Sequence, residues 1–144
     1  MSSSIHAVEQ FRGGLNCSQA VLAEFAADYG LDTEAALKVA TGFGGGMGRL
    51  GLTCGAVTGA IAVLGLAMAA PDPRAPQAKV SVYAAVCDFV KQFEAVNGAT
   101  ACSELLGCNI GTPEGYEEAT RQGLLQTRCP KYVADAVEIL EEML

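Results

Sequence analysis

Apolar residues in this chain recur at the three- and four-residue spacing of an amphipathic helix, and no stretch alternates apolar and polar residues long enough to predict a strand. Because side chains at this spacing share one face of a helix, each such segment must bury that face against other helices. A chain of 144 residues is long enough to form one domain with a substantial core. We therefore predict an all-α fold, a compact single-domain bundle over residues 1–144.

Start and stop signals divide the chain into about five main helices and several short ones. The expected helices cover residues 4–12, 16–29, 32 or 33–41, 52–69, 77–97, 101–106, a segment opened by Thr112-Pro113-Glu114, and 130–143. The stretch 50–71 carries no charge and has the length of a membrane span. Its glycine and alanine content and its lack of an aromatic belt instead favour a hydrophobic helix at the centre of the bundle.

Four of the six cysteines lie where the sequence signals the start of a helix. They are Cys17, Cys54, Cys102 and Cys129. The signals are independent of the thiols: Asn16 and Thr100 are capping residues, Gly51 closes a glycine-rich turn, and Pro130 suits the first turn of a helix. Free backbone N–H groups and the helix dipole stabilise a thiolate at such positions, which predicts a lowered pKa and a raised reactivity.

Each of these cysteines also lies on the apolar face of its predicted helix. Cys17 shares a face with Val21 and Phe25, Cys54 with Val57 and Ile61, Cys102 with Leu105 and Leu106, and Cys129 with Val133, Val137 and Leu140. Any one of these cysteines alone is better explained as a packing residue. Four together predict convergence, with at least three thiols within about 8 Å of one another.

A glycine-rich tract covers residues 42–51, just before the most apolar helix. Three of its glycines have GxGxxG spacing, but a dinucleotide site needs a preceding strand, and a helix is predicted there. So many glycines instead let the backbone approach an anion, the sulfurs of a cluster or another helix. The residues expected to bind a cofactor are Gly45, Gly46, Gly48, Gly51 and Gly55.

Other residues have simpler interpretations. Gly55 and Gly59 lie one turn apart, a pattern typical of close contact with a neighbouring helix. Cys87 lies beside the apolar stripe of the 77–97 helix, which favours a packing role; the stripe consists of Val82, Val86, Phe89, Phe93 and Val96.

Cys108 lies in a loop near Cys102, as a further candidate resolving thiol or metal ligand. His6, the only histidine, is expected at the surface, which argues against a catalytic triad.

Charge and composition restrict the partners. The net charge is −7 and the nine basic residues are scattered, which argues against nucleic acid and anionic lipid. The N-terminal residues lack the pattern of a secretory signal, so we expect a cytoplasmic protein, where scattered cysteines are more often catalytic, redox-sensing or metal-binding. No CxxC motif is present, so a zinc ribbon or a thioredoxin-type site has no support. The expected partner is a redox protein or a small thiol, and a homo-oligomer is left open.

Several motifs together suggest a family. They are NCSQAV at 16–21, GFGGGMG at 42–48, CGAVTG at 54–59, CSELLG at 102–107 and CP at 129–130. Over almost its whole length the chain resembles the C_GCAxxG_C_C family of redox-active proteins, whose four recurrent cysteines correspond to the four at helix starts. The family name spells the central motif GCAxxG, whereas this chain reads CGAxxG from Cys54. The resemblance implies a redox role and no particular substrate.

Three functions remain open at this stage. The leading hypothesis is thiol/disulfide exchange or electron transfer by the clustered cysteines, as in a thiol/disulfide oxidoreductase, with Cys54 as the best nucleophile because the glycine tract approaches it and a long helix follows it. The alternative is a metal-binding protein in which the same four thiols, with Cys108 as a further candidate, hold zinc or an iron–sulfur cluster. The third is a non-catalytic helical interaction module with inert cysteines.

Overall fold

The computed structural model describes residues 2–144 and has the all-α fold that the apolar periodicity predicts. The helices are α1 (Ser3–Arg12), α2 (Cys17–Ala26), α3 (Thr33–Ala40), α4 (Gly55–Met68), α5 (Pro76–Asn97), α6 (Cys102–Leu106), α7 (Pro113–Arg121), α8 (Leu124–Thr127) and α9 (Cys129–Met143). Short 3₁₀ turns follow α2 and α3. Among the described residues, extended backbone pairs only at an isolated antiparallel bridge between Thr53 and Ala101.

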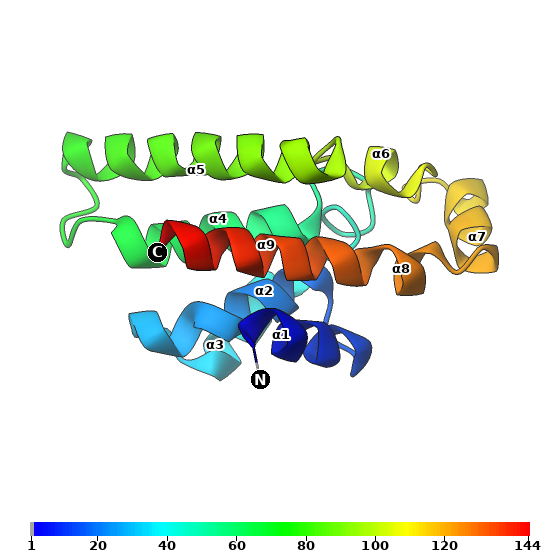
Figure 1. Ribbon diagram of the computed structural model, residues 1–144, viewed down its shortest axis with the longest axis horizontal. Helices are drawn as coiled ribbons and strands as arrows, with labels where there is room; N and C mark the ends of the chain where they lie inside the picture. The colour runs from blue at the N-terminus through cyan, green and yellow to red at the C-terminus, as the bar shows by residue number, and fades with distance from the viewer. Residues whose placement is uncertain (1) are drawn as a thin grey trace.

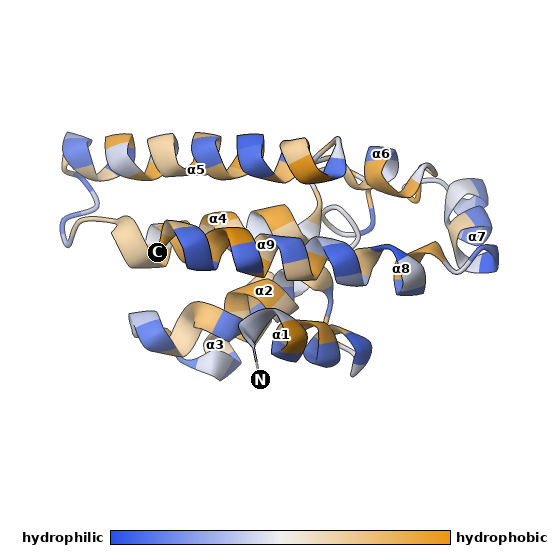
Figure 2. Cartoon of the chain, in the orientation of Figure 1, coloured by the Kyte–Doolittle hydropathy of each residue, from blue (hydrophilic) through white to orange (hydrophobic). Residues whose placement is uncertain are grey.

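The helices are stacked around α4 (Figure 1). The long helix α5 lies on one side of α4 and α9. On the other side α2 packs against α4 and α1 packs against α9, with α3 beyond α2. Helix α4 packs against α2, α5 and α9, and its residues Val57, Val63 and Leu64 are fully buried. The predicted central hydrophobic helix is therefore confirmed, and Figure 2 shows apolar residues along much of it. None of the described helices has both the length and the apolar character that crossing a membrane requires.

Local signals set most of the helix ends. Asn16 caps α2 in a reciprocal capping box with Gln19, as its side chain predicts. Gly98 ends α5 in the left-handed conformation, with φ of 84°. Two predicted starts are shifted. Helix α4 begins at Gly55 rather than at residue 52, and α6 is preceded by Ala101 rather than capped by Thr100, because the two segments before these helices pair with each other.

Helix α5 is an outer helix and buries one face. Phe89 and Phe93 are fully buried against the core, whereas Val96 at the end of the predicted stripe is 58% exposed. Cys87 precedes Phe89 by two residues, which places it on the opposite side of the helix, and it is exposed. The interpretation of Cys87 as a packing residue is therefore wrong.

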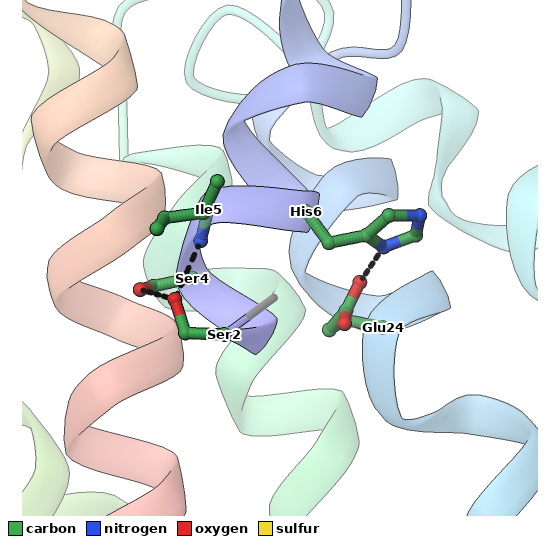
Figure 3. Close-up of polar contacts among 5 residues, drawn as sticks. All are labelled: Ser2, Ser4, Ile5, His6 and Glu24. Carbon is green, nitrogen blue, oxygen red and sulfur yellow. Dashed lines mark hydrogen bonds and ion pairs between the residues drawn. The ribbon is translucent and has the colours of Figure 1, made fainter.

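Polar contacts hold α1 against its neighbours. His6 lies on the surface, as expected, and its Nδ1 is 2.6 Å from Oε2 of Glu24 on α2 (Figure 3). This hydrogen bond raises the pKa of His6 above its ordinary value. On the other side, the Ser4 hydroxyl donates to Glu138 on α9 at 3.4 Å. These contacts involve none of the residues that line the thiol cavity described below.

Candidate functional site

Four thiols line one cavity of about 190 Å³ with a mainly apolar wall. The cavity lies where the N-termini of α2, α4, α6 and α9 meet the glycine-rich tract. Its lining consists of Phe11, Asn16, Cys17, Gly45, Arg49, Cys54, Cys102, Leu105, Leu106, Ile110, Tyr116, Leu125, Cys129 and Tyr132. The four cysteines that the sequence places at helix starts are thus brought together. Neither Cys108, which is partly buried nearby, nor the exposed Cys87 lines this cavity.

Glycines on α4 allow the start of α2 to approach the start of α4. A Cβ atom on Gly55 would lie only 2.5 Å from the Cys17 sulfur and 3.0 Å from the Ser18 nitrogen. One turn later, a Cβ atom on Gly59 would lie 2.8 Å from the Ser18 carbonyl oxygen. The predicted close helix contact at this glycine pair is confirmed, and it is what places Cys17 beside Cys54.

Backbone pairing before α4 and α6 aligns a second pair of thiols. The Cys54 N–H donates to the Thr100 carbonyl at 2.8 Å, and the Cys102 N–H donates to the Leu52 carbonyl at 2.5 Å. These bonds flank the isolated bridge and fix the register of the two segments. Cys54 and Cys102 therefore enter the cavity from neighbouring, hydrogen-bonded segments.

The glycine-rich tract passes close to the thiols. The Gly45 backbone hydrogen bonds to Cys17 and lines the cavity. Gly46 has φ of 69°, and a Cβ atom on it would lie 2.7 Å from the Cys102 Cβ, so only glycine fits this approach. Of the other glycines expected at the site, Gly51 lies against Ser103, and Gly48 lines a neighbouring hollow instead of the cavity.

Cys17 has the most stabilised thiolate of the cluster. The Cys54 thiol donates a hydrogen bond to it, and this bond is the largest cause that lowers the pKa of Cys17, to about 7. Burial opposes this shift, but backbone hydrogen bonds from Gly45, Cys17 itself and Gly55 add to it. The expectation of a lowered pKa at a helix start is confirmed for Cys17.

The same expectation is wrong for the other three thiols. The hydrogen bond to Cys17 and then burial raise the pKa of Cys54 well above its ordinary value. Burial, followed by the negative charge of Cys17, raises the pKa of Cys102 to about 11 and that of Cys129 to about 12. Burial destabilises a thiolate by more than the dipole and free N–H groups at the start of a helix stabilise it. The difference is greatest at a short helix such as α6, which has five residues. Its position at a helix start predicts that Cys54 is a thiolate. With its raised pKa, Cys54 instead keeps its proton and interacts with Cys17 as a donor.

Two residues that we did not identify from the sequence hold α9 against α6. The buried Tyr132 hydroxyl donates to the Leu105 carbonyl at 2.9 Å, and Arg128 Nη1 donates to the Leu105 and Leu106 carbonyls at 3.2 and 3.0 Å. These bonds fix the start of α9, where Cys129 lies, at the end of α6. Tyr132 follows Cys129 by three residues, so the helical spacing could have placed it at the cavity.

A third unidentified residue, Arg49, lies at the edge of the cavity. Its guanidinium carbon is 4.3 Å from the centre of the Tyr116 ring, in a cation–π contact. Arg49 also lines a neighbouring hollow that is more open and more polar than the cavity. Its backbone is in the left-handed region with φ of 64°, unusual for a residue with a side chain. No helical periodicity or start signal in the sequence marks this position.

The arrangement of the thiols also bears on metal binding. Thiolates are suitable ligands for zinc or an iron–sulfur cluster. Within residues 2–144, however, no group of three or more His, Cys, Asp or Glu side chains is arranged to hold a metal ion. The cavity does bring together two thiols whose pKa values are shifted in opposite directions, Cys17 downwards and Cys54 upwards.

Comparison with known proteins points to the same segments. The family model described as "Putative redox-active protein (C_GCAxxG_C_C)" matches residues 15–143, which include all four cavity cysteines. No curated protein and no solved structure matches the chain. The match covers nearly the entire chain, from the residue before the α2 cap to the end of α9.

Proposed function

The chain belongs to the C_GCAxxG_C_C family of redox-active proteins, and we propose that it reduces substrate disulfides through reversible disulfide formation between Cys17 and Cys54. The observation that carries this proposal is the close packing of the start of α2 on the start of α4, which brings Cys17 and Cys54 together in one cavity. There the Cys54 thiol is the largest cause that lowers the pKa of Cys17, to about 7. A thiol with a pKa near the ambient pH is the most effective attacking group in thiol/disulfide exchange. Two thiols that enter one cavity from closely packed helix starts need only a small movement to form a disulfide.

The proposed reaction has two steps. The Cys17 thiolate attacks one sulfur of the substrate disulfide, the substrate S–S bond breaks, and one substrate thiolate leaves with the electron pair. Cys54 then gives its proton to that leaving thiolate and attacks the Cys17 sulfur, and the second substrate thiolate leaves and takes a proton from water. The substrate is reduced to two thiols, and the protein is oxidised to the Cys17–Cys54 disulfide.

The difference in pKa assigns the order of attack. Cys17 is the cavity thiol that ionises most readily near neutral pH, because its pKa is lowered to about 7 whereas the pKa values of the other three are raised. Cys54, whose pKa is raised, keeps its proton until the mixed disulfide removes the charge on Cys17. Cys102 and Cys129 are also protonated at neutral pH, so we assign them to a later exchange at the same cavity.

The test is to map which cysteines react. Reduced protein is mixed with hydroxyethyl disulfide at neutral pH, quenched with acid, alkylated, and analysed by peptide mass spectrometry. We expect a Cys17–Cys54 disulfide in the wild type. Cys54→Ser should keep its helical circular dichroism and stop at a mixed disulfide on Cys17, because the resolving thiol is missing. Cys17→Ser should form neither product.

The matched control is Cys87→Ser, which removes an exposed thiol that does not line the cavity. It should behave like the wild type. Two results would contradict the proposal: wild-type protein in which Cys17 and Cys54 stay reduced, or a Cys17→Ser variant that reduces the disulfide as fast as the wild type.

A further inference from the structure

Arg49 presents a positive charge beside the thiol cavity. The Tyr116 ring supports one face of its guanidinium group, which fixes the group while leaving N–H edges available. In the described part of the chain, carboxylates form ion pairs with His6, Lys38, Arg121 and Lys131, and Arg49 is in none of these pairs. A protein with a net charge of −7 thus holds a cation here that its own carboxylates do not neutralise.

Two hollows meet at Arg49. Arg49, Asn16 and Gly45 line both the thiol cavity and the more open, polar hollow beside it. The thiol cavity measures about 190 Å³, less than the roughly 300 Å³ at which pockets for whole small ligands begin. A substrate larger than this volume therefore places its sulfur-bearing part among the thiols and extends out of the cavity. The rest of the molecule must lie in the polar hollow, next to the guanidinium group.

We propose that the substrate of the Cys17–Cys54 pair is a small disulfide that carries a carboxylate, which Arg49 binds at the edge of the thiol cavity. This inference rests on the proposed function and adds the class of substrate. The planar N–H donors of arginine match a carboxylate in geometry and charge. The mainly apolar wall of the cavity suits the uncharged atoms around the disulfide.

The charge of Arg49 also reduces the repulsion between the Cys17 thiolate and an anionic substrate. The Cys17 thiolate repels an anionic substrate as it approaches, and the low dielectric of a buried site strengthens this repulsion. A cation at the edge of the cavity offsets it for an anionic disulfide and has little effect on a neutral one. The unusual φ of Arg49 keeps the side chain at this edge, because the glycine tract fixes the backbone through the Arg49 N–H bond to the Gly44 carbonyl at 3.2 Å.

The experiment compares two disulfides of similar size and different charge. The anionic probe is dithiodiglycolate, with a carboxylate at each end, and the neutral probe is hydroxyethyl disulfide. The rate of Cys17–Cys54 disulfide formation is measured by acid quench and mass spectrometry in the wild type and in Arg49→Gln. We expect Arg49→Gln to react about tenfold more slowly than the wild type with dithiodiglycolate, because the variant loses a charge-assisted hydrogen bond to the carboxylate. Its rate with hydroxyethyl disulfide should be unchanged.

The control variant is Arg74→Gln, which removes the same charge from the loop at the opposite end of α4 (Figure 1). It should react like the wild type with both probes. The inference is overturned if Arg49→Gln slows both probes equally, since Arg49 then acts on Cys17 rather than on substrate, or if it slows neither. Wild-type protein that forms no Cys17–Cys54 disulfide with either probe would instead overturn the proposed function itself.

Discussion

At the scale of the residue, Cys17 and Cys54 show that one side-chain type at one kind of position can have opposite chemistry. Both lie at the start of a buried helix. Cys17 accepts a hydrogen bond from the other thiol and more from the backbone, and its pKa falls to about 7. Cys54 donates that bond and is buried, and its pKa rises. The interaction between the two thiols therefore shifts their pKa values in opposite directions.

This assignment predicts different effects for two substitutions of Cys54. Cys54→Ala removes the hydrogen-bond donor, so the pKa of Cys17 should rise above about 7, because that bond is the largest cause of its lowering. Cys54→Ser keeps a hydroxyl donor at the same position and should leave the pKa of Cys17 closer to that of the wild type. The measurement is the pH dependence of Cys17 alkylation by iodoacetamide, read by peptide mass spectrometry. An equal pKa of Cys17 in both variants would show that the bond from Cys54 does not set it.

At the scale of the element, α4 shows how glycines on one helix have different roles. Gly55 and Gly59 lie against the start of α2, where a side chain has no room. A Cβ atom on Gly65, ten residues after Gly55 on the same helix, would have no other atom within 4 Å. Gly55 and Gly59 shape the thiol site, whereas Gly65 lowers the stability of the helix and no close contact requires a glycine there.

We therefore expect Gly55→Ala and Gly65→Ala to change the free energy of unfolding in opposite directions. Gly55→Ala should lower it by about 1–3 kcal/mol, because the new methyl group must displace Cys17 or the backbone of Ser18. Gly65→Ala should raise it by up to about 1 kcal/mol, the difference in helix propensity. The measurement is urea unfolding followed by circular dichroism under reducing conditions. Equal stability in the two variants would contradict the close packing of α4 against α2.

At the scale of the whole molecule, the fold buries three of its six thiols where the protonated form is favoured: Cys54, Cys102 and Cys129. Burial raises the pKa of Cys102 to about 11 and that of Cys129 to about 12, from the ordinary value of 9.0. Above pH 9.0 the unfolded chain therefore binds fewer protons than the folded one, which destabilises the fold as the pH rises. Cys17 acts in the opposite sense, since its stabilising contribution is present above pH 9.0 and is lost as the pH falls towards about 7.

The free energy of unfolding of the reduced protein should accordingly decrease between pH 9.0 and about 11–12. Cys102→Ser removes one of the buried thiols that keep their protons, so its stability should decrease less steeply over this range. Cys87→Ser removes an exposed thiol and should follow the wild type. Urea unfolding at several pH values, with a reductant present, measures all three proteins. A Cys102→Ser profile parallel to the wild type would show that Cys102 is not protonated in the fold at alkaline pH.

Much of the fold was predictable because its causes are local. Capping residues, glycine stops and apolar spacing act within a few residues, so they gave the all-α class, most helix bounds and the central α4. The same spacing placed Cys17, Cys54, Cys102 and Cys129 on buried faces, where the structure has them. Ile61, expected on the same face as Cys54, is only partly buried. Cys87 was misplaced because it lies beside the apolar stripe and not on it: two residues before Phe89, it is on the opposite side of α5.

The sequence by itself thus determined most of the helices, although not the short α8, together with the inward position of the four thiols and the membership of the family. Only the tertiary structure decided which thiol has the lowered pKa and which residues surround it. A pKa depends on desolvation and on charges and donors within a few ångströms, and at Cys17 these come from α4 and the glycine tract, about thirty or more residues away along the chain. The same holds for Arg49, which packs on Tyr116 and reaches the thiol cavity through a turn that no local pattern marks.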